Sequence, residues 1–195
     1  MLESLTRLIT QTRSCRRFDE AAPISLETLR SLIDLARLAG SAKNLQPLRY
    51  MLINDPALTE KVFPHLGWAG YLSDWPGPVE GERPTAYIAC LLDTRISDRD
   101  QSDLGIASQN ILLGATALGL AGCRIGSISP RLRDVLALPD HLELLLVLAL
   151  GRPRETVRIE PMGLDNDPRY WRDKNGIHHV PKRTVDDLLI PPPEG

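Results

Sequence analysis

The sequence predicts an α+β sandwich, a domain in which helices cover a central sheet. Two observations carry this prediction: segments with apolar residues at helical spacing recur along the chain, and they alternate with a few short, continuously apolar runs that are typical of buried strands. The chain has 195 residues, which favours a single domain on a prior of ~150 residues per domain. A domain of this size can bury a core without disulfide support.

The first part of the chain alternates helices with one strand. The expected elements, in order, are a helix over 3–11, a helix over 26–39, a polar loop over 41–47, a strand over 49–54 and a short helix over 56–63. The helix over 26–39 has the clearest limits, because Ser25 is a favourable N-cap residue and Gly40 a favourable residue to end a helix.

The second part begins after a long connection over 64–84 that is rich in glycine, proline and aromatic residues. This connection is either a lid that shapes a substrate site or an apolar plug at a subunit interface. The next expected elements are a strand over 86–92, a helix over 102–120, a short strand or extended turn over 123–128, a helix over 130–136 and a strand over 143–150. The helix over 102–120 is apolar on nearly all sides, so we expect it in the core or at a subunit interface.

Composition excludes several classes of function. The 23 basic and 25 acidic residues give a formal net charge of −2, whereas proteins that bind nucleic acids or membrane surfaces usually have a basic excess. The three cysteines have no CxxC spacing, which argues against a disulfide framework or a zinc site, and Cys90 and Cys123 should be buried thiols. Because no apolar stretch is long enough for a signal peptide or a membrane span, we expect a soluble, cytoplasmic protein.

A basic cluster follows the first expected helix. Arg13, Arg16 and Arg17 lie within five residues of one another, beside Ser14, and arginine side chains bind phosphate oxygens through paired hydrogen bonds. Taken alone, such a cluster is more often a solvated turn. Cys15 within it could have a lowered thiol pKa, but a packing role is the favoured interpretation.

Two loops contain residues suited to a flat ligand. Segment 40–47 has serine, asparagine and glutamine side chains that match the edge of a planar heterocycle, although such residues also satisfy local backbone groups. In segment 119–127, Gly126 permits close approach of a ligand, or the glycines simply make turns around a core strand. No motif for a Rossmann or P-loop nucleotide site is present.

The polar C-terminal region, from residue 152 onward, contains weaker indications of a binding site. His178 and His179 have no further metal ligands at suitable spacing, so we interpret them as a surface pair. Lys182 and Arg183 could bind phosphate. The region from residue 152 onward has too little apolar content to fold alone, so it is either disordered or packed along another surface.

The order of these segments is more specific than any one of them. Arg-Ser-x-Arg-x-Phe after an N-terminal helix is followed by Ser-x-x-Asn-x-Gln-Pro, by Gly-Leu-Ala-Gly-x-x-Ile-Gly and by Pro-Lys-Arg near the C-terminus. This combination resembles the nitroreductase family of FMN-dependent oxidoreductases from Leu5 to Leu189. The resemblance implies a three-layer α+β sandwich with a central, mostly antiparallel sheet. It also implies an extended C-terminal arm over 152–195 that wraps the partner subunit, and a homodimer with FMN at the interface.

The resemblance also assigns cofactor-binding residues. Arg13, Ser14 and Arg16 would hold the phosphate, the ribityl chain and the pyrimidine edge, Lys182 and Arg183 would complete the phosphate site, and Arg17 is an alternative phosphate contact. The flavin ring would be lined by residues of the two loops, namely Ser41, Ala42, Lys43, Asn44, Gln46, Ile125, Gly126 and Ser127. No catalytic acid or base and no metal are expected, and Arg16 would stabilise the reduced flavin.

The implied function is transfer of hydride from NAD(P)H through flavin N5 to a small aromatic, nitro or quinone-type acceptor by a ping-pong mechanism. Two alternatives stay open at this point. The chain could catalyse another flavin reaction on the same fold, such as that of a dehydrogenase or a dehalogenase. It could also bind flavin without turnover. The expected partners are the small-molecule acceptor and a second copy of the chain, with no nucleic acid and no membrane.

Overall fold

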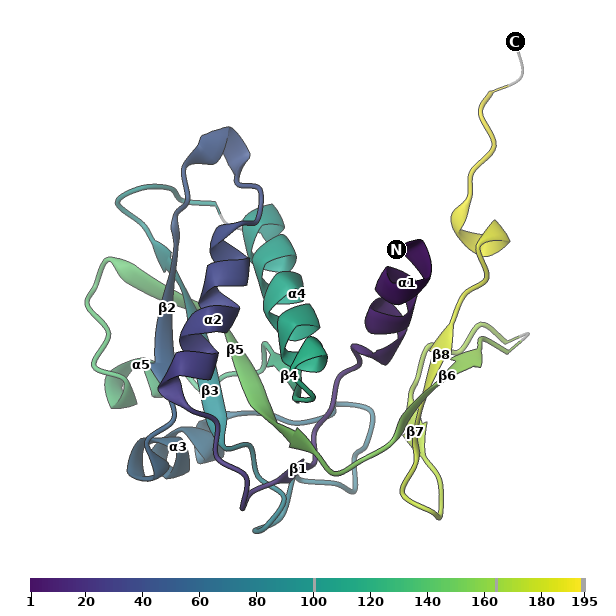
Figure 1. The fold of residues 1–195 in the computed structure, drawn as a ribbon, viewed down its shortest axis with the longest axis horizontal. Helices are drawn as coiled ribbons and strands as arrows, with labels where there is room; N and C mark the ends of the chain where they lie inside the picture. The colour runs from purple at the N-terminus through teal and green to yellow at the C-terminus, as the bar shows by residue number, and fades with distance from the viewer. Residues whose placement is uncertain (100, 164, 194–195) are drawn as a thin grey trace.

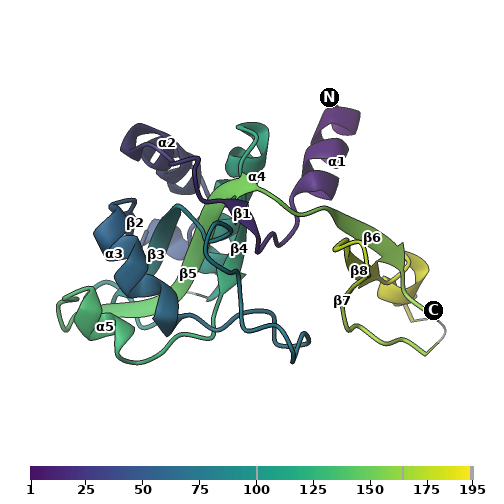
Figure 2. The same ribbon diagram turned by 90° about the horizontal axis from the view of Figure 1, so that it is seen from below.

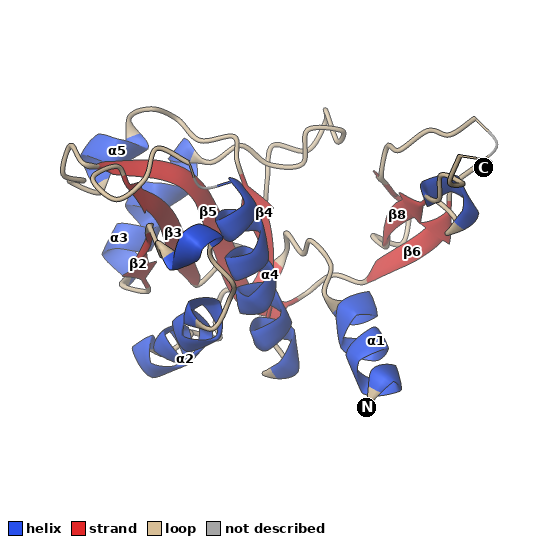
Figure 3. Cartoon of the chain, turned by 90° about the horizontal axis from the view of Figure 1, so that it is seen from above, coloured by secondary structure: helices blue, strands red, loops and turns tan. Residues whose placement is uncertain are grey.

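A five-stranded antiparallel sheet forms the middle layer of the molecule (Figure 1). The computed structural model describes residues 1–99, 101–163 and 165–193, without the side chain of residue 101. The strands of this sheet are β1 (Phe18–Asp19), β2 (Leu48–Ile53), β3 (Ala86–Asp93), β4 (Ala121–Ile125) and β5 (Leu142–Pro153). With helices on both faces, the structure confirms the predicted three-layer α+β sandwich (Figures 2 and 3).

The long strand β5 organises the sheet. It pairs with β3, with β4 and, near its end, with β1, while β2 pairs with the other edge of β3. Every residue of β3 is buried, because helices cover both faces of the sheet. Ile88 and Cys90 belong to one core cluster and Tyr87 and Ala89 to the other, as expected for side chains that alternate between faces.

Two helices cover each face of the sheet. Helices α2 (Leu26–Arg37) and α4 (Gln101–Ala117) pack on one face, and α3 (Pro56–Val62) and α5 (Leu132–Val135) lie on the other (Figure 3). The Ser25 side chain accepts the predicted N-cap hydrogen bond from the Thr28 N–H at 3.1 Å. Helix α4 ends three residues before the predicted limit, because Gly119 has a φ of 72° and the chain then enters β4.

The two ends of the chain lie beside this sandwich. Helix α1 (Leu2–Gln11) has no buried residue and lies alongside α4 (Figure 1). The C-terminal region forms a second, three-stranded sheet in the order β6 (Val157–Pro161), β8 (His178–Lys182), β7 (Trp171–Arg172), which sequence patterns did not predict. Within the described residues, none of the helices is both long and apolar enough to cross a membrane.

Candidate functional site

A cavity of about 290 Å³ lies between the segment after α1, the helix α4, the strand β4 and the C-terminal sheet. Its lining includes four cationic side chains, those of Arg13, Arg16, Arg124 and Lys182. No carboxylate occurs among the described residues that line it. We call it the cationic cavity, and its charge suits an anionic group with several acceptor oxygens.

Backbone pairing brings the basic cluster to this cavity. After α1 the chain runs beside β4, where Ser14 forms a bridge with Gly122 and the Cys15 N–H donates to the Gly122 carbonyl at 3.0 Å. Position 122 has no room for a side chain, because a Cβ there would lie 2.5 Å from the carbonyl oxygen of Ala149 on β5. Phe18, fully buried, anchors the far end of the segment. The predicted phosphate-binding motif is therefore fixed at both ends.

The two arginines of the motif have different surroundings. Arg13 turns back to the end of α1, where its Nε donates to the Thr12 carbonyl at 2.6 Å and its Nη2 to the Ile9 carbonyl at 2.9 Å. Partial burial lowers the pKa of Arg13. Arg16 instead reaches the C-terminal sheet, and its guanidinium lies 5.0 Å from the centre of the Tyr170 ring. Both side chains remain in the lining of the cavity.

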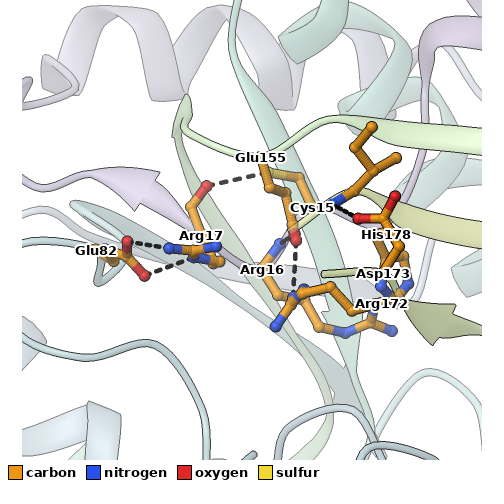
Figure 4. Close-up of polar contacts among 9 residues, drawn as sticks. Cys15, Arg16, Arg17, Glu82, Glu155, Arg172, Asp173 and His178 are labelled. Atoms are coloured by element: carbon orange, nitrogen blue, oxygen red, sulfur yellow. Dashed lines mark hydrogen bonds and ion pairs between the residues drawn. The ribbon is translucent and has the colours of Figure 1, made fainter. Parts of the chain in front are cut away.

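Glu155 connects the C-terminal sheet to the basic cluster (Figure 4). Its side chain is fully buried, and its carboxylate accepts hydrogen bonds from the Arg16 backbone N–H and from Arg172 Nη2, the latter at 2.8 Å. The Arg172 guanidinium also lies 4.6 Å from the centre of the Trp75 ring. One buried carboxylate thus holds the C-terminal sheet, the cluster and the connection that contains Trp75 together.

Two members of the cluster do not line the cationic cavity. Burial raises the pKa of the Cys15 thiol to about 12. The structure therefore supports a packing role for Cys15, and the alternative of a lowered thiol pKa is wrong. Arg17 makes a two-pronged ion pair with Glu82, with 2.6 Å between Arg17 Nε and Glu82 Oε2 (Figure 4). The pair raises the pKa of Arg17 and lowers that of Glu82. The structure therefore gives no support to Arg17 as an alternative phosphate contact.

The interpretation of His178 and His179 as a surface pair is wrong. They sit on β8, where neighbouring side chains point to opposite faces. His178 is 1% exposed and lines the cationic cavity, whereas His179 hydrogen-bonds to Glu160 at 2.7 Å and stacks on Trp171. Among the described residues there is no group of three or more potential metal ligands suited to an ion.

Burial of His178 predicts a specific pH dependence of stability. The pKa of His178 is lowered to about 4, chiefly by burial; Glu155 opposes this shift, and Arg16 and Arg172 add to it. The unfolded chain binds this proton below its ordinary pKa of ~6.5, and the folded chain does not until about pH 4. The free energy of unfolding should therefore fall as the pH drops through this window.

The measurement compares urea unfolding at pH 7 and pH 5 in the wild type and in His178→Asn. The variant should lose less stability between the two pH values, because the buried imidazole is gone. The raised pKa of His179 contributes in the opposite direction, but it is common to both proteins. An unchanged difference between pH 7 and pH 5 in the variant would contradict the assignment.

The loop at Ser41 adopts a strained backbone. Lys43, Asn44 and Gln46 have φ values of 52°, 57° and 51°, a region that residues other than glycine rarely occupy. Ser41 holds the loop together, since its hydroxyl donates to Asp103 Oδ2 at 2.6 Å and accepts from the Gln46 N–H at 2.9 Å. Strain of this kind is maintained where the surroundings fix the backbone, and it is frequent at functional sites.

This loop and the basic cluster lie at opposite ends of α4. Ser41 and Gln46 line a second cavity, also of about 290 Å³, together with Asp103 in the first turn of the helix. Thr12, beside the basic cluster, hydrogen-bonds instead to Thr116 near the last turn, at 3.0 Å. A rise of 1.5 Å per residue separates the two ends by about 20 Å. Within one chain, therefore, the two groups of predicted cofactor-binding residues do not meet.

Replacing Asp103 with alanine should loosen the loop. The buried carboxylate accepts from the Ser41 hydroxyl and from the Ala42 N–H at 3.1 Å, and each such bond to a charged group contributes ~1.5–3 kcal/mol. Tryptic cleavage after the exposed Lys43 should become about tenfold faster or more, because cleavage follows local opening. Mass spectrometry of early digests measures this rate. Asp134→Ala, an exposed change, is the control, and an unaltered rate in the Asp103 variant would contradict the anchoring role.

The remaining predicted residues lie outside the cationic cavity. Ile125 is buried at the end of β4, and the Ser127 carbonyl accepts from the Gly67 N–H at 2.8 Å. Arg183 donates to Asn166 Oδ1 at 3.0 Å. The residues that the cationic cavity does bring together are Arg13, Ser14, Arg16 and Lys182. The residues that it does not bring together are Ser41, Ala42, Lys43, Asn44, Gln46, Ile125, Gly126, Ser127 and Arg183. Their roles toward a cofactor stay predictions.

The cavity contains residues that sequence reasoning missed, chiefly Arg124, Tyr170 and His178. The sequence contained an indication for Arg124. It is a lone charged residue between two strand residues that are buried, Cys123 and Ile125, and its side chain must point to the opposite face of the strand from theirs. Tyr170 and His178 had none, since they belong to a region without periodic hydrophobicity.

The connection over 64–84 lies against the C-terminal sheet. The Tyr71 and Tyr170 rings are 5.0 Å apart between their centres, and Trp75 lies against Arg172. Both interpretations of this connection, as a lid and as a plug at an interface, stay predictions.

The model of the nitroreductase family matches residues 9–77 and 86–152. The chain is 30% identical over 172 residues to an NADH dehydrogenase of Thermus thermophilus, covering 73% of this chain and 83% of that protein. It is 28% identical over 166 residues to an oxygen-insensitive NADPH nitroreductase of Salmonella typhimurium, covering 79% and 68%. The solved structure of an FMN-dependent nitroreductase from Clostridium difficile has a TM-score of 0.61 at 20% identity, over 75% of this chain and 86% of that one.

Proposed function

The chain belongs to the nitroreductase family, and on that premise we propose that it is an FMN-dependent oxidoreductase that moves hydride from NAD(P)H to a small aromatic, nitro or quinone-type acceptor. Its relatives include an NADH dehydrogenase and an NADPH nitroreductase, which are oxidoreductases. The observation that carries the cofactor proposal is the cationic cavity, where residues from motifs far apart in the sequence meet.

The cationic cavity fits the phosphate end of FMN. Arg13, Arg16 and Lys182 offer charged donors, Ser14 offers a neutral one, and a phosphate monoester carries nearly two negative charges at neutral pH. The buried Nδ1 of His178 has no hydrogen-bond partner within the described part of the chain, so it is available to a ligand in the cavity. A volume of about 290 Å³ is at the lower end for ligand pockets, so the flavin ring would extend beyond it.

We place that ring at the interface of a homodimer. The loop at Ser41–Gln46 is held at the first turn of α4, whereas the basic cluster contacts Thr116 about 20 Å further along the helix, so we expect a second copy to supply the loop. Helix α1 supports the proposed homodimer. It buries no residue and exposes an apolar stripe of Leu2, Leu5 and Ile9, which a partner subunit would shield from water. The arm over 152–195 would wrap the partner subunit.

The protein's own contribution is binding and electrostatics. When bound, FMN would supply the chemistry of hydride transfer between NAD(P)H and the acceptor, for which we propose a ping-pong order. Arg13, Arg16 and Lys182 would neutralise the phosphate, and Arg16 would also stabilise the negative charge of the reduced state. No acid or base from the chain is needed for this transfer.

We also place the enzyme in the cytoplasm. Its three cysteines, Cys15, Cys90 and Cys123, are all free and buried. Unpaired thiols are the rule in reducing compartments and are unusual in secreted proteins.

The visible spectrum of the purified protein tests this function. We expect a yellow protein that bleaches on addition of NADH or NADPH without oxygen and regains its colour with a nitroaromatic or a quinone. Bound flavin that no donor reduces would favour a flavin-binding protein without turnover. A colourless protein that does not take up FMN would overturn the proposal.

A further inference from the structure

Arg124 occupies the wall of the cationic cavity on the side of α4. It leaves β4 between two buried neighbours and crosses to the helix, where its Nε donates to Ser108 Oγ at 2.9 Å and its Nη2 to Gln109 Oε1 at 2.8 Å. Ser108 is itself 1% exposed. Two hydrogen bonds therefore fix the guanidinium plane before any ligand arrives.

The hydrogen-bond partners of Arg124 are neutral, as are those of Arg13, whereas Arg17 and Arg172 have carboxylate partners. Arg17 pairs with Glu82 and Arg172 pairs with Glu155. In the described part of the chain, no carboxylate lies within ion-pair distance of Arg124. Burial lowers its pKa, as expected for a cation without a counter-charge. Two neutral hydrogen-bond partners hold the guanidinium in place, and no carboxylate of the described residues neutralises its charge.

Nη1 is the nitrogen of Arg124 that can still donate hydrogen bonds to a ligand. Its Nε and Nη2 are engaged, and Nη1 has no hydrogen-bond partner within the described residues. The same cavity contains Arg13, Arg16 and Lys182. Four like charges in one cavity repel one another, and a ligand with two negative charges relieves that repulsion. An arginine that is oriented, uncompensated and free at one nitrogen is suited to a phosphate oxygen.

We propose that Arg124 binds the phosphate of FMN, with Ser108 and Gln109 as positioning residues, and that it selects FMN over the unphosphorylated riboflavin. The proposal rests on the proposed function, since it takes FMN as the cofactor. It adds a fourth cation, contributed by β4, to the three that the motifs supply.

Fluorescence titration of the flavin-free protein with FMN and with riboflavin tests the proposal. In Arg124→Gln, FMN should bind about tenfold to hundredfold more weakly, and riboflavin should bind as it does to the wild type. Arg124→Lys should lie in between, because lysine keeps the charge but loses the fixed plane. Ser108→Ala should weaken FMN alone, by a smaller factor. Arg131→Gln removes an exposed charge of the same sign and should change neither affinity.

The outcomes separate this proposal from the proposed function. Equal weakening of FMN and riboflavin in Arg124→Gln would overturn it, because Arg124 would then contact a part that both ligands share. Unchanged FMN affinity would overturn it as well. A wild type that binds neither flavin would instead reject the function on which the proposal rests. Circular dichroism of each flavin-free variant, and Arg124→Lys as the milder change, separate loss of a contact from loss of fold.

Discussion

Replacing both Arg13 and Arg16 with alanine should weaken FMN binding at least about a hundredfold while the protein stays folded. Each arginine would lose charge-assisted hydrogen bonds to the phosphate, which contribute ~1.5–3 kcal/mol apiece. Because ~1.4 kcal/mol is a tenfold change in affinity, two such losses exceed a hundredfold. The expected result is a colourless protein of normal size.

The structure explains why the fold should survive this double change. The Arg16 group that Glu155 holds is the backbone N–H, which alanine keeps. The Arg13 side chain caps only the end of α1, through the Thr12 and Ile9 carbonyls, and α1 contributes no buried residue. The loss of stability should therefore be limited to the cap and to the contact of Arg16 with Tyr170.

The matched control removes the same charge elsewhere. Arg30 and Arg131 are exposed and lie outside the cationic cavity, so Arg30→Ala with Arg131→Ala changes the net charge equally. Flavin content after purification and equilibrium titration with FMN are the measurements. The control should keep its flavin. If the Arg13 and Arg16 variant keeps it too, the phosphate site is not at the basic cluster.

The sandwich could be predicted from sequence because its signals are local and agree with one another. Ser25 makes the N-cap hydrogen bond that its position indicates, and Leu29 and Leu32 are fully buried at the spacing of a helix. The continuous apolar run of β3 is buried on both faces. In each case propensity, pattern and packing favour the same structure.

The C-terminal sheet could not be predicted in the same way. Val157 pairs in parallel register with His178, a partner 21 residues later that no local pattern indicates. The burial of His178 depends on this pairing and on contact with Tyr170 and Arg16. A histidine in a polar, proline-rich region gives no sign of such contacts, so its interpretation as a surface residue failed.

The grouping of residues in the candidate site could be predicted in part. Motif order identified Arg13, Ser14, Arg16 and Lys182, which the fold brings to one cavity. Arg124 was missed because its position in the cavity depends on Ser108 and Gln109 of α4, which no motif links to β4. What a motif supplies is the identity of residues near one another in the chain. The contacts between motifs come from tertiary structure.

Replacing Glu155 with alanine should lower the free energy of unfolding by ~3–5 kcal/mol, the usual cost of removing one partner from a buried ion pair. The Arg172 guanidinium, 15% exposed, would lose its counter-charge, and the Arg16 N–H would lose its acceptor. Such a loss is a large share of the ~5–15 kcal/mol that stabilises a typical domain. Urea unfolding, followed by tryptophan fluorescence, measures it.

Tryptophan fluorescence also reports which contact is lost in the Glu155→Ala variant. Arg172 lies 4.6 Å from the centre of the Trp75 ring, so release of Arg172 should change the emission of Trp75 before global unfolding. Trp75→Phe in the Glu155→Ala background should remove that early change. Glu143→Ala, an exposed change on β5, is the charge-matched control and should stay within ~0.5 kcal/mol of the wild type.

Glu155→Gln separates the two roles of the carboxylate. The amide keeps an acceptor oxygen for the Arg16 N–H but carries no charge to pair with Arg172, so its loss of stability should come from the ion pair. FMN affinity should fall more in Glu155→Ala than in Glu155→Gln, because only alanine also frees the backbone that positions Arg16. If both variants unfold like the wild type, Glu155 does not join the C-terminal sheet to the basic cluster. If both lose FMN equally, the ion pair with Arg172, and not the bond to Arg16, positions the cavity.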